Sequence, residues 1–117
     1  MIPTDELKVR LRKLLNEKIP TSGTEADTRF EDIDIVDLLT ESNTVYEAAA
    51  VGWTMKAGMY QAEMGEIEST STGQESYKLI ALKDRQSYAL KQAEIYMGMG
   101  KQQDNSFIFK VVSPEVL

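Results

Sequence analysis

The feature that most constrains the fold is a long apolar pattern in the middle of the chain, over residues 44–68. Its apolar residues recur every three or four positions, the spacing that places side chains on one face of an α-helix. One stripe comprises Tyr46, Ala50, Trp53, Ala57, Tyr60, Met64 and Ile67, and a neighbouring stripe comprises Val45, Ala48, Gly52, Met55, Met59 and Ala62. Because the combined face is too wide for a surface helix, we expect a central helix packed on more than one side.

Glycines within this helix suggest close approach by another backbone. Each costs about 1 kcal/mol relative to alanine in a helix interior, and the segment contains Gly52, Gly58 and Gly65. Gly58 and Gly65 lie seven residues apart and therefore share a third face, together with Val51 and Thr54. We interpret Val51, Thr54, Gly58 and Gly65 as a subunit interface. Close packing within one chain is the alternative.

Three further helices are expected, which gives an all-α fold of about four helices. The first spans residues 5–17, with Thr4 as N-cap and basic side chains outside its leucine stripe; those bases either face solvent or contact an acidic partner. The second spans residues 31–42, and the last spans residues 81–97 before Gly98 and Gly100. The buried residues expected for the second helix are Ile33, Val36, Leu38 and Leu39, with Phe30 as a hydrophobic staple.

The C-terminal segment has a different character. Residues 106–112 (SFIFKVV) are rich in aromatic and β-branched residues, which favours a β-strand. A lone strand must pair, either with its own chain or with the sheet edge of another protein. We therefore divide the chain into a helical domain, residues 1–103, and an extended docking tail, residues 104–117. The proposed docking residues are Phe107, Ile108, Phe109, Val111 and Val112.

The charge pattern argues against non-specific DNA binding, which requires a basic surface. The chain has 13 basic and 19 acidic residues, a net charge of −6. An acidic segment over residues 21–47 separates two mildly basic ends. This asymmetry suits head-to-tail contacts between copies, and a solvated acidic surface is the alternative.

The chain contains neither cysteine nor histidine. This excludes disulfides, the usual zinc sites and the Ser-His and Cys-His nucleophile pairs. The acidic run Glu31, Asp32, Asp34 and Asp37 suits a helix N-terminus and is only a weak candidate for a divalent cation. A metal-dependent enzyme using Asp34, Asp37 and Glu41 is the least favoured hypothesis. We expect no catalytic residue, metal or cofactor. No signal peptide or membrane span is evident, so we expect synthesis in the cytoplasm.

Three runs carry a family resemblance: TDELKVRLRKLL, GTEADTRFEDIDIVDLL, and AAAVGWTMKAGMYQAEMGEIESTSTGQESYKLIALKDRQSYAL. Together they resemble the head-tail connector (adaptor) proteins of long-tailed bacteriophages, especially phages of Gram-positive bacteria. The resemblance covers roughly residues 4–97. Its most telling part is MGEIES at the end of the long helix, followed by GQESY and LKDR.

The resemblance implies an all-α virion protein without enzymatic activity. Such adaptors form a ring, here expected to contain twelve copies, that docks beneath the portal in the virion neck. The ring extends the DNA channel without binding DNA specifically, and a stopper or tail component binds below it. By analogy, residues Thr70, Ser71, Thr72, Gly73 and Gln74 face the lumen or the next ring, and the tail contacts the portal or a neck protein. A cytosolic oligomeric regulator or binding module unrelated to virions is the alternative.

Overall fold

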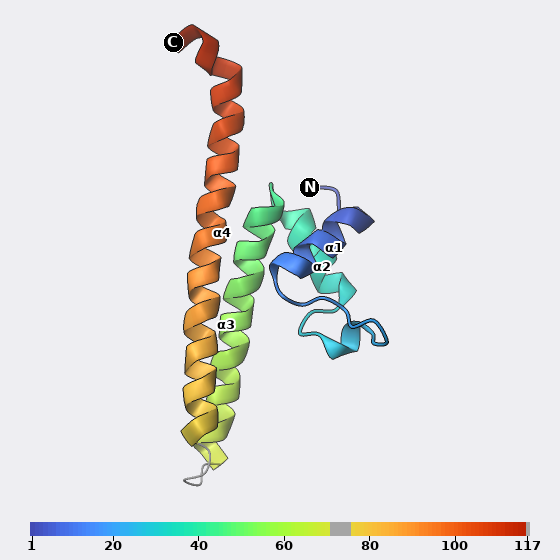
Figure 1. The fold of residues 1–117 in the computed structure, drawn as a ribbon, viewed down its shortest axis with the longest axis vertical. Helices are drawn as coiled ribbons and strands as arrows, with labels where there is room; N and C mark the ends of the chain where they lie inside the picture. Colours follow the sequence, from blue (N-terminus) through green and yellow to red (C-terminus); the bar gives the residue numbers. More distant parts are fainter. Residues whose placement is uncertain (71–75, 117) are drawn as a thin grey trace.

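A computed structural model describes the backbone of residues 1–70 and 76–116, and the side chains of residues 1–68 and 77–102. Its elements are α1 (Asp5–Leu14), the 3-10 helix η1 (Glu25–Asp27), α2 (Asp32–Glu41), α3 (Val45–Thr70) and α4 (Ser76–Val116). The described residues contain no strand, so the expected all-α class is confirmed. Figure 1 shows α3 and α4 as an antiparallel hairpin, with α1 and α2 packed beside α3.

The long central helix lies where the apolar pattern predicts it. Its first stripe is buried from Ala50 to Met64, and Tyr46 and Ile67 at the two ends are partly buried. The buried residues of α4 that complete this core are Leu82, Ala89 and Ala93. The second stripe is covered in its first half only, because α1 and α2 lie beside the N-terminal part of α3 (Figure 1).

The first two helices begin with the expected local chemistry. The Thr4 hydroxyl accepts a hydrogen bond from the Leu7 amide at 3.2 Å, which confirms the N-cap. Phe30 is fully buried, as is Ile35 four positions after the N-cap Glu31. The prediction that Ile33 is buried is wrong, since 59% of it is exposed. Residues 35, 38 and 39 form the buried face of α2, and position 33 lies on another side of the helix.

The C-terminal predictions need correction. We predicted a helix end at residue 97 and a strand over residues 106–112, but α4 continues as one helix to Val116. A glycine ends a helix most effectively by adopting a positive φ, and none of the described glycines does so. A helix also satisfies its own backbone hydrogen bonds, whereas a lone strand needs a partner.

The glycines of α3 fall into two kinds. A Cβ atom added to Gly52 would lie 2.5 Å from Leu15 Cδ2, so this glycine admits the fully buried Leu15. A Cβ added to Gly58 or Gly65 would meet nothing within 4 Å. Among the three glycines of α3, only Gly52 therefore needs to be glycine for packing against the described residues.

We predict opposite effects of alanine at these two kinds of position. Gly52→Ala forces Leu15 to move, an overpacking cost of about 1–3 kcal/mol that outweighs the helix-propensity gain. Gly58→Ala meets open space and should stabilise the monomer by up to about 1 kcal/mol. Urea unfolding followed by circular dichroism measures both, and a Gly52→Ala variant as stable as Gly58→Ala would contradict the packing described here.

Candidate functional site

A buried cation fixes the end of α1 on α3. Lys56 of α3 is 3% exposed, and its ammonium donates to the Leu15 carbonyl at 2.8 Å. The same ammonium pairs with Glu17 at 2.6 Å and lies 4.3 Å from the centre of the Trp53 ring. The Trp53 indole N–H donates to the Leu14 carbonyl at 3.0 Å. Two side chains of α3 thereby satisfy carbonyls at the C-terminal end of α1 that lack helical partners. We call this group the α1 anchor.

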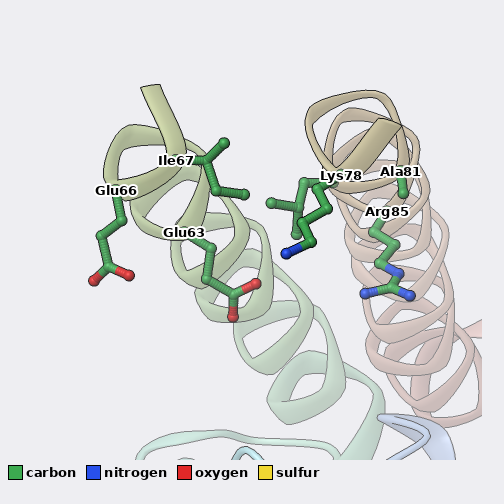
Figure 2. Close-up of a pocket in the computed structure, with 7 residues that line it drawn as sticks. Glu63, Glu66, Ile67, Lys78, Ala81 and Arg85 are labelled. Carbon is green, nitrogen blue, oxygen red and sulfur yellow. The ribbon is translucent and has the colours of Figure 1, made fainter. Parts of the chain in front are cut away.

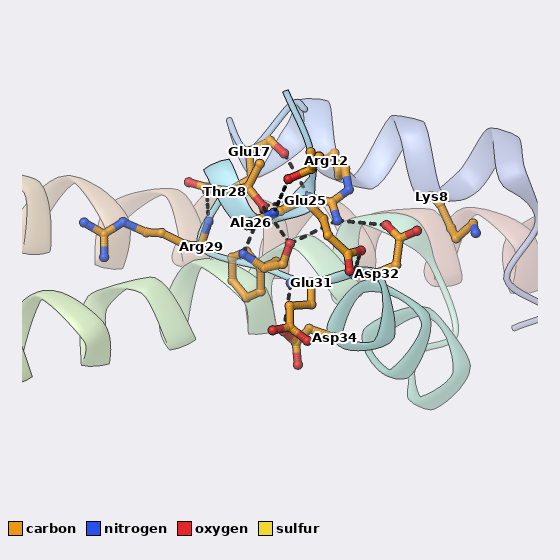
Figure 3. Close-up of polar contacts among 12 residues, drawn as sticks. Lys8, Arg12, Glu17, Glu25, Ala26, Thr28, Arg29, Glu31, Asp32 and Asp34 are labelled. Carbon is orange, nitrogen blue, oxygen red and sulfur yellow. Dashed lines mark hydrogen bonds and ion pairs between the residues drawn. The ribbon is translucent and has the colours of Figure 1, made fainter. Parts of the chain in front are cut away.

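Arg12 organises the segment that follows α1 (Figure 3). Its guanidinium donates to the carbonyls of Glu17 and Phe30, to the Thr28 hydroxyl at 3.1 Å, and to Asp32 at 2.9 Å. The prediction that it belongs to a solvated or partner-binding basic face is wrong, because Arg12 is buried. The guanidinium holds both ends of the segment between α1 and α2 and is therefore a structural group.

Arg29 forms the outermost link of this network. It donates to Glu63 of α3 at 2.7 Å and lies 4.5 Å from the centre of the Tyr60 ring. The hydrogen bond to Glu63 raises the pKa of the Arg29 guanidinium, and burial partly opposes the rise. Because both partners remain about a third exposed, the pair contributes at most about 1 kcal/mol.

Aromatic side chains line the α3–α4 contact beside the α1 anchor. Trp53 meets Tyr88 edge-to-face, with 5.5 Å between ring centres. Tyr46 stacks with Tyr96 at 6.3 Å, and the Arg10 guanidinium donates to the Tyr46 hydroxyl at 3.1 Å. Burial raises the pKa of Tyr96, with smaller contributions from Tyr88 and Tyr46. These rings join α1, α3 and α4.

The four predicted interface residues lie together on an exposed face of α3. Val51 is 41% exposed, and Thr54, Gly58 and Gly65 are also exposed. Packing within the described part of the chain therefore does not explain Gly58 or Gly65. Met55 and Ala62 extend the same exposed face, although the sequence pattern assigned them to the buried second stripe. A subunit contact at this face stays a prediction.

A second apolar surface lies on α4 and was missed in the sequence. Tyr77, Tyr88, Ile95 and Met99 are all exposed. They are separated by 11, 7 and 4 residues, which places them on one side of the helix. The spacing alone could have revealed this surface, but the expected helix end at residue 97 concealed its length.

A shallow cavity of about 370 Å³ opens between α3 and α4 near their connection. Its lining combines acids of α3 with bases of α4, and Figure 2 shows Glu63 and Lys78 on facing walls. The lining residues are Glu63, Glu66, Ile67, Lys78, Ala81, Leu82 and Arg85. These lining residues include no serine, threonine or tyrosine that could act as a nucleophile. The chain also has no cysteine thiol, and no histidine to act as a general base.

Two acidic residues at the start of α2 are occupied within the fold. Asp32 pairs with Arg12, and Asp34 accepts from the Glu31 amide at 3.0 Å as part of a capping box. Within the described side chains, no three Asp or Glu residues converge closely enough to hold a metal ion. Likewise, no helix in the described residues is long and apolar enough to cross a bilayer.

The chain matches no known protein-family model, and comparisons with curated proteins and with solved structures give no significant match. The predicted lumen loop lies outside the described residues, apart from the Thr70 backbone at the end of α3. The side chains of the predicted docking residues also lie outside, although their backbone belongs to α4.

We predict that the α1 anchor contributes strongly to stability. Lys56→Met leaves the Glu17 carboxylate buried without its cation and should lower the free energy of unfolding by about 3–5 kcal/mol. The double variant Lys56→Met/Glu17→Met should recover part of that loss, because it removes both buried charges.

The matched control is Lys8→Met, which breaks the exposed pair between Lys8 and Asp5. It should change stability by less than about 0.5 kcal/mol. Urea unfolding followed at 222 nm compares the three variants. Equal stability of Lys56→Met and Lys8→Met would show that the anchor contributes little.

The raised pKa of Tyr96 predicts a stability change in alkali. Because the unfolded chain loses this phenolic proton first, stability is intact below about pH 10 and falls as pH rises through the folded pKa. Tyr96→Phe should show a smaller alkaline loss than the parent, whereas Tyr77→Phe, at an exposed position, should follow the parent. Urea midpoints measured between pH 9 and pH 12 test this, and identical alkaline losses in all three proteins would contradict it.

Proposed function

We propose that the chain is a structural subunit of a bacteriophage head-tail connector, which assembles as a twelve-copy ring between the portal and the stopper or tail. The proposal rests first on the quoted sequence runs, which resemble adaptor proteins over residues 4–97. It places the protein in the virion neck, around DNA that passes through without specific binding, and assigns it no enzymatic reaction.

The observation that carries the proposal is the pair of exposed apolar faces on the α3–α4 hairpin. Val51, Met55 and Gly58 lie on one, and Tyr88 and Ile95 lie on the other. Exposed apolar surface of this extent is typical of proteins that assemble. By contrast, the buried polar groups described above are paired with one another and serve the fold.

The C-terminal end of α4 suits a docking role in this scheme. Gly100 lies against the start of α3. A Cβ atom added to Gly100 would lie 3.3 Å from the Glu47 amide nitrogen. Beyond it the backbone of α4 projects past the remaining elements (Figure 1). We assign residues 104–116 to contact with the portal or a neighbouring neck protein, as a helix rather than as the strand first predicted.

Co-expression with a bacteriophage portal protein tests the proposal. The tagged chain should copurify with portal particles, and electron microscopy should show a coaxial ring of twelve subunits. Deleting residues 104–117 should leave the helical circular dichroism signal of the remaining residues while abolishing portal binding.

Each outcome has a separate meaning. Normal portal binding by the truncated chain would contradict the role of the C-terminal helix alone. A chain that ignores portal particles and forms only small oligomers of its own would contradict the connector proposal and favour the regulator or binding module. Glu68→Gln, an exposed change on α3, serves as the control that keeps portal binding.

A further inference from the structure

The outer apolar face of α4 is largely exposed within the described structure, although the Tyr88 ring also contacts Trp53 of α3. We define this face by Tyr77, Tyr88, Ile95 and Met99, whose exposed fractions are 82, 56, 48 and 37%. It follows the helix for about 33 Å, at 1.5 Å per residue. Ala81 and the exposed Asp84 lie between Tyr77 and Tyr88 on this side, and exposed apolar patches of this kind are typical of protein contact sites.

The open face of α3 carries mainly small side chains. Its members are Val51, Met55, Gly58, Ala62 and Gly65, which alternate in steps of four and three residues. This is the spacing of a coiled-coil seam, along which side chains of one helix enter spaces on another. No charged residue interrupts the row, and no atom of the described residues lies within 4 Å of a Cβ atom added to Gly58 or Gly65. Large side chains of a second helix can therefore approach closely.

The two faces point to opposite sides of the hairpin. The cavity marks one side, and its lining residue Ala81 shares a helix face with Tyr77 and Tyr88. The hydrogen bond between the side chains of Gln61 and Gln86 marks the other side, and Gln61 shares its face with Gly58 and Gly65. One molecule therefore cannot bring its own two faces together.

The charges of the two helices are also complementary. Between residues 77 and 102, α4 carries five basic and two acidic side chains. Of the four acidic residues of α3, Glu63 pairs with Arg29, and the single basic residue of α3, Lys56, is buried against Glu17. The surface of α3 is therefore net negative, whereas the surface of α4 is net positive. This difference favours contact between α3 of one copy and α4 of another, and it disfavours contact between two copies of the same face.

We propose that the outer face of α4 in one copy packs on the open face of α3 in the next copy. Tyr88 and Ile95, which are seven residues apart, then lie above Gly58 and Gly65, which are also seven residues apart. Because the two faces are different and point in opposite directions, the contact is heterologous and passes from copy to copy, forming a ring if the rotation closes. Closure into a ring rests on the proposed function, whereas the contact itself does not.

The absence of native cysteine allows a direct test by cross-linking. A disulfide forms when Cα atoms come within roughly 4.4–6.8 Å. Gly58→Cys is mixed, at high protein concentration under mild oxidation, with single variants along α4: Tyr77→Cys, Ile95→Cys or Met99→Cys. At least one mixture should give heterodimers on a non-reducing gel. A double variant that carries Gly58→Cys together with the cross-linking α4 substitution in one chain should give a ladder of higher oligomers on the same gel.

Ser87→Cys is the matched control, because Ser87 is exposed on α4 but lies outside the outer face. It should give no heterodimer with Gly58→Cys. Three results would overturn the proposal: no cross-link with any outer-face position, equal cross-linking with Ser87→Cys, or efficient homodimers of Gly58→Cys alone. A failed cross-link in a chain that still forms rings on portal particles would reject this contact only, and a successful one without portal binding would reject the connector function only.

Discussion

The fold depends on the neutralisation of one buried cation. Lys56 lies inside the α1–α3 contact, where an unpaired ammonium would be strongly destabilising. The Glu17 carboxylate that pairs with it uses its second oxygen to accept from the Arg29 amide at 2.7 Å. One side chain thus connects α3, the end of α1 and the segment leading to α2. Gly52, one helical turn before Lys56, provides the space in which Leu15 completes the contact.

This arrangement leaves α3 with three different surroundings. One side packs on α4, a second receives α1 and α2 over the first half of the helix, and the third is open. Every buried side-chain polar atom in the described residues has a hydrogen-bond partner, so these buried polar groups serve the fold. The exposed faces of α3 and α4 carry apolar and charged side chains.

Much of the helical core could be predicted from the sequence, because apolar spacing reports directly on buried helix faces. The stripe from Tyr46 to Ile67 and the Thr4 cap are examples. The roles of Arg12 and Lys56 could not be predicted, since their partners are loop carbonyls and hydroxyls brought close only by tertiary packing. The C-terminal strand prediction failed because β-propensity depends on a pairing partner, and a helix needs none.

The candidate site was predicted in part. Spacing placed Val51, Thr54, Gly58 and Gly65 on one face, but it could not distinguish an open face from a covered one. Gly52 looks the same as Gly58 in the sequence, and only the position of Leu15 separates their roles. On α4, Tyr88 and Ile95 lie within the helix predicted over residues 81–97, whereas Tyr77 precedes its predicted start and Met99 follows its predicted end, so the length of this surface was missed.

The unbroken length of α4 has a mechanical consequence. About sixteen residues follow Gly100, a projection of roughly 24 Å beyond the start of α3 at 1.5 Å per residue. A helix of this kind acts as a lever whose pivot is the α3–α4 contact. A tilt of about 10° at the pivot would displace the far end by roughly 4 Å, by simple geometry from that length. Small adjustments in the packing of α3 against its neighbours would thus be amplified at the C-terminus.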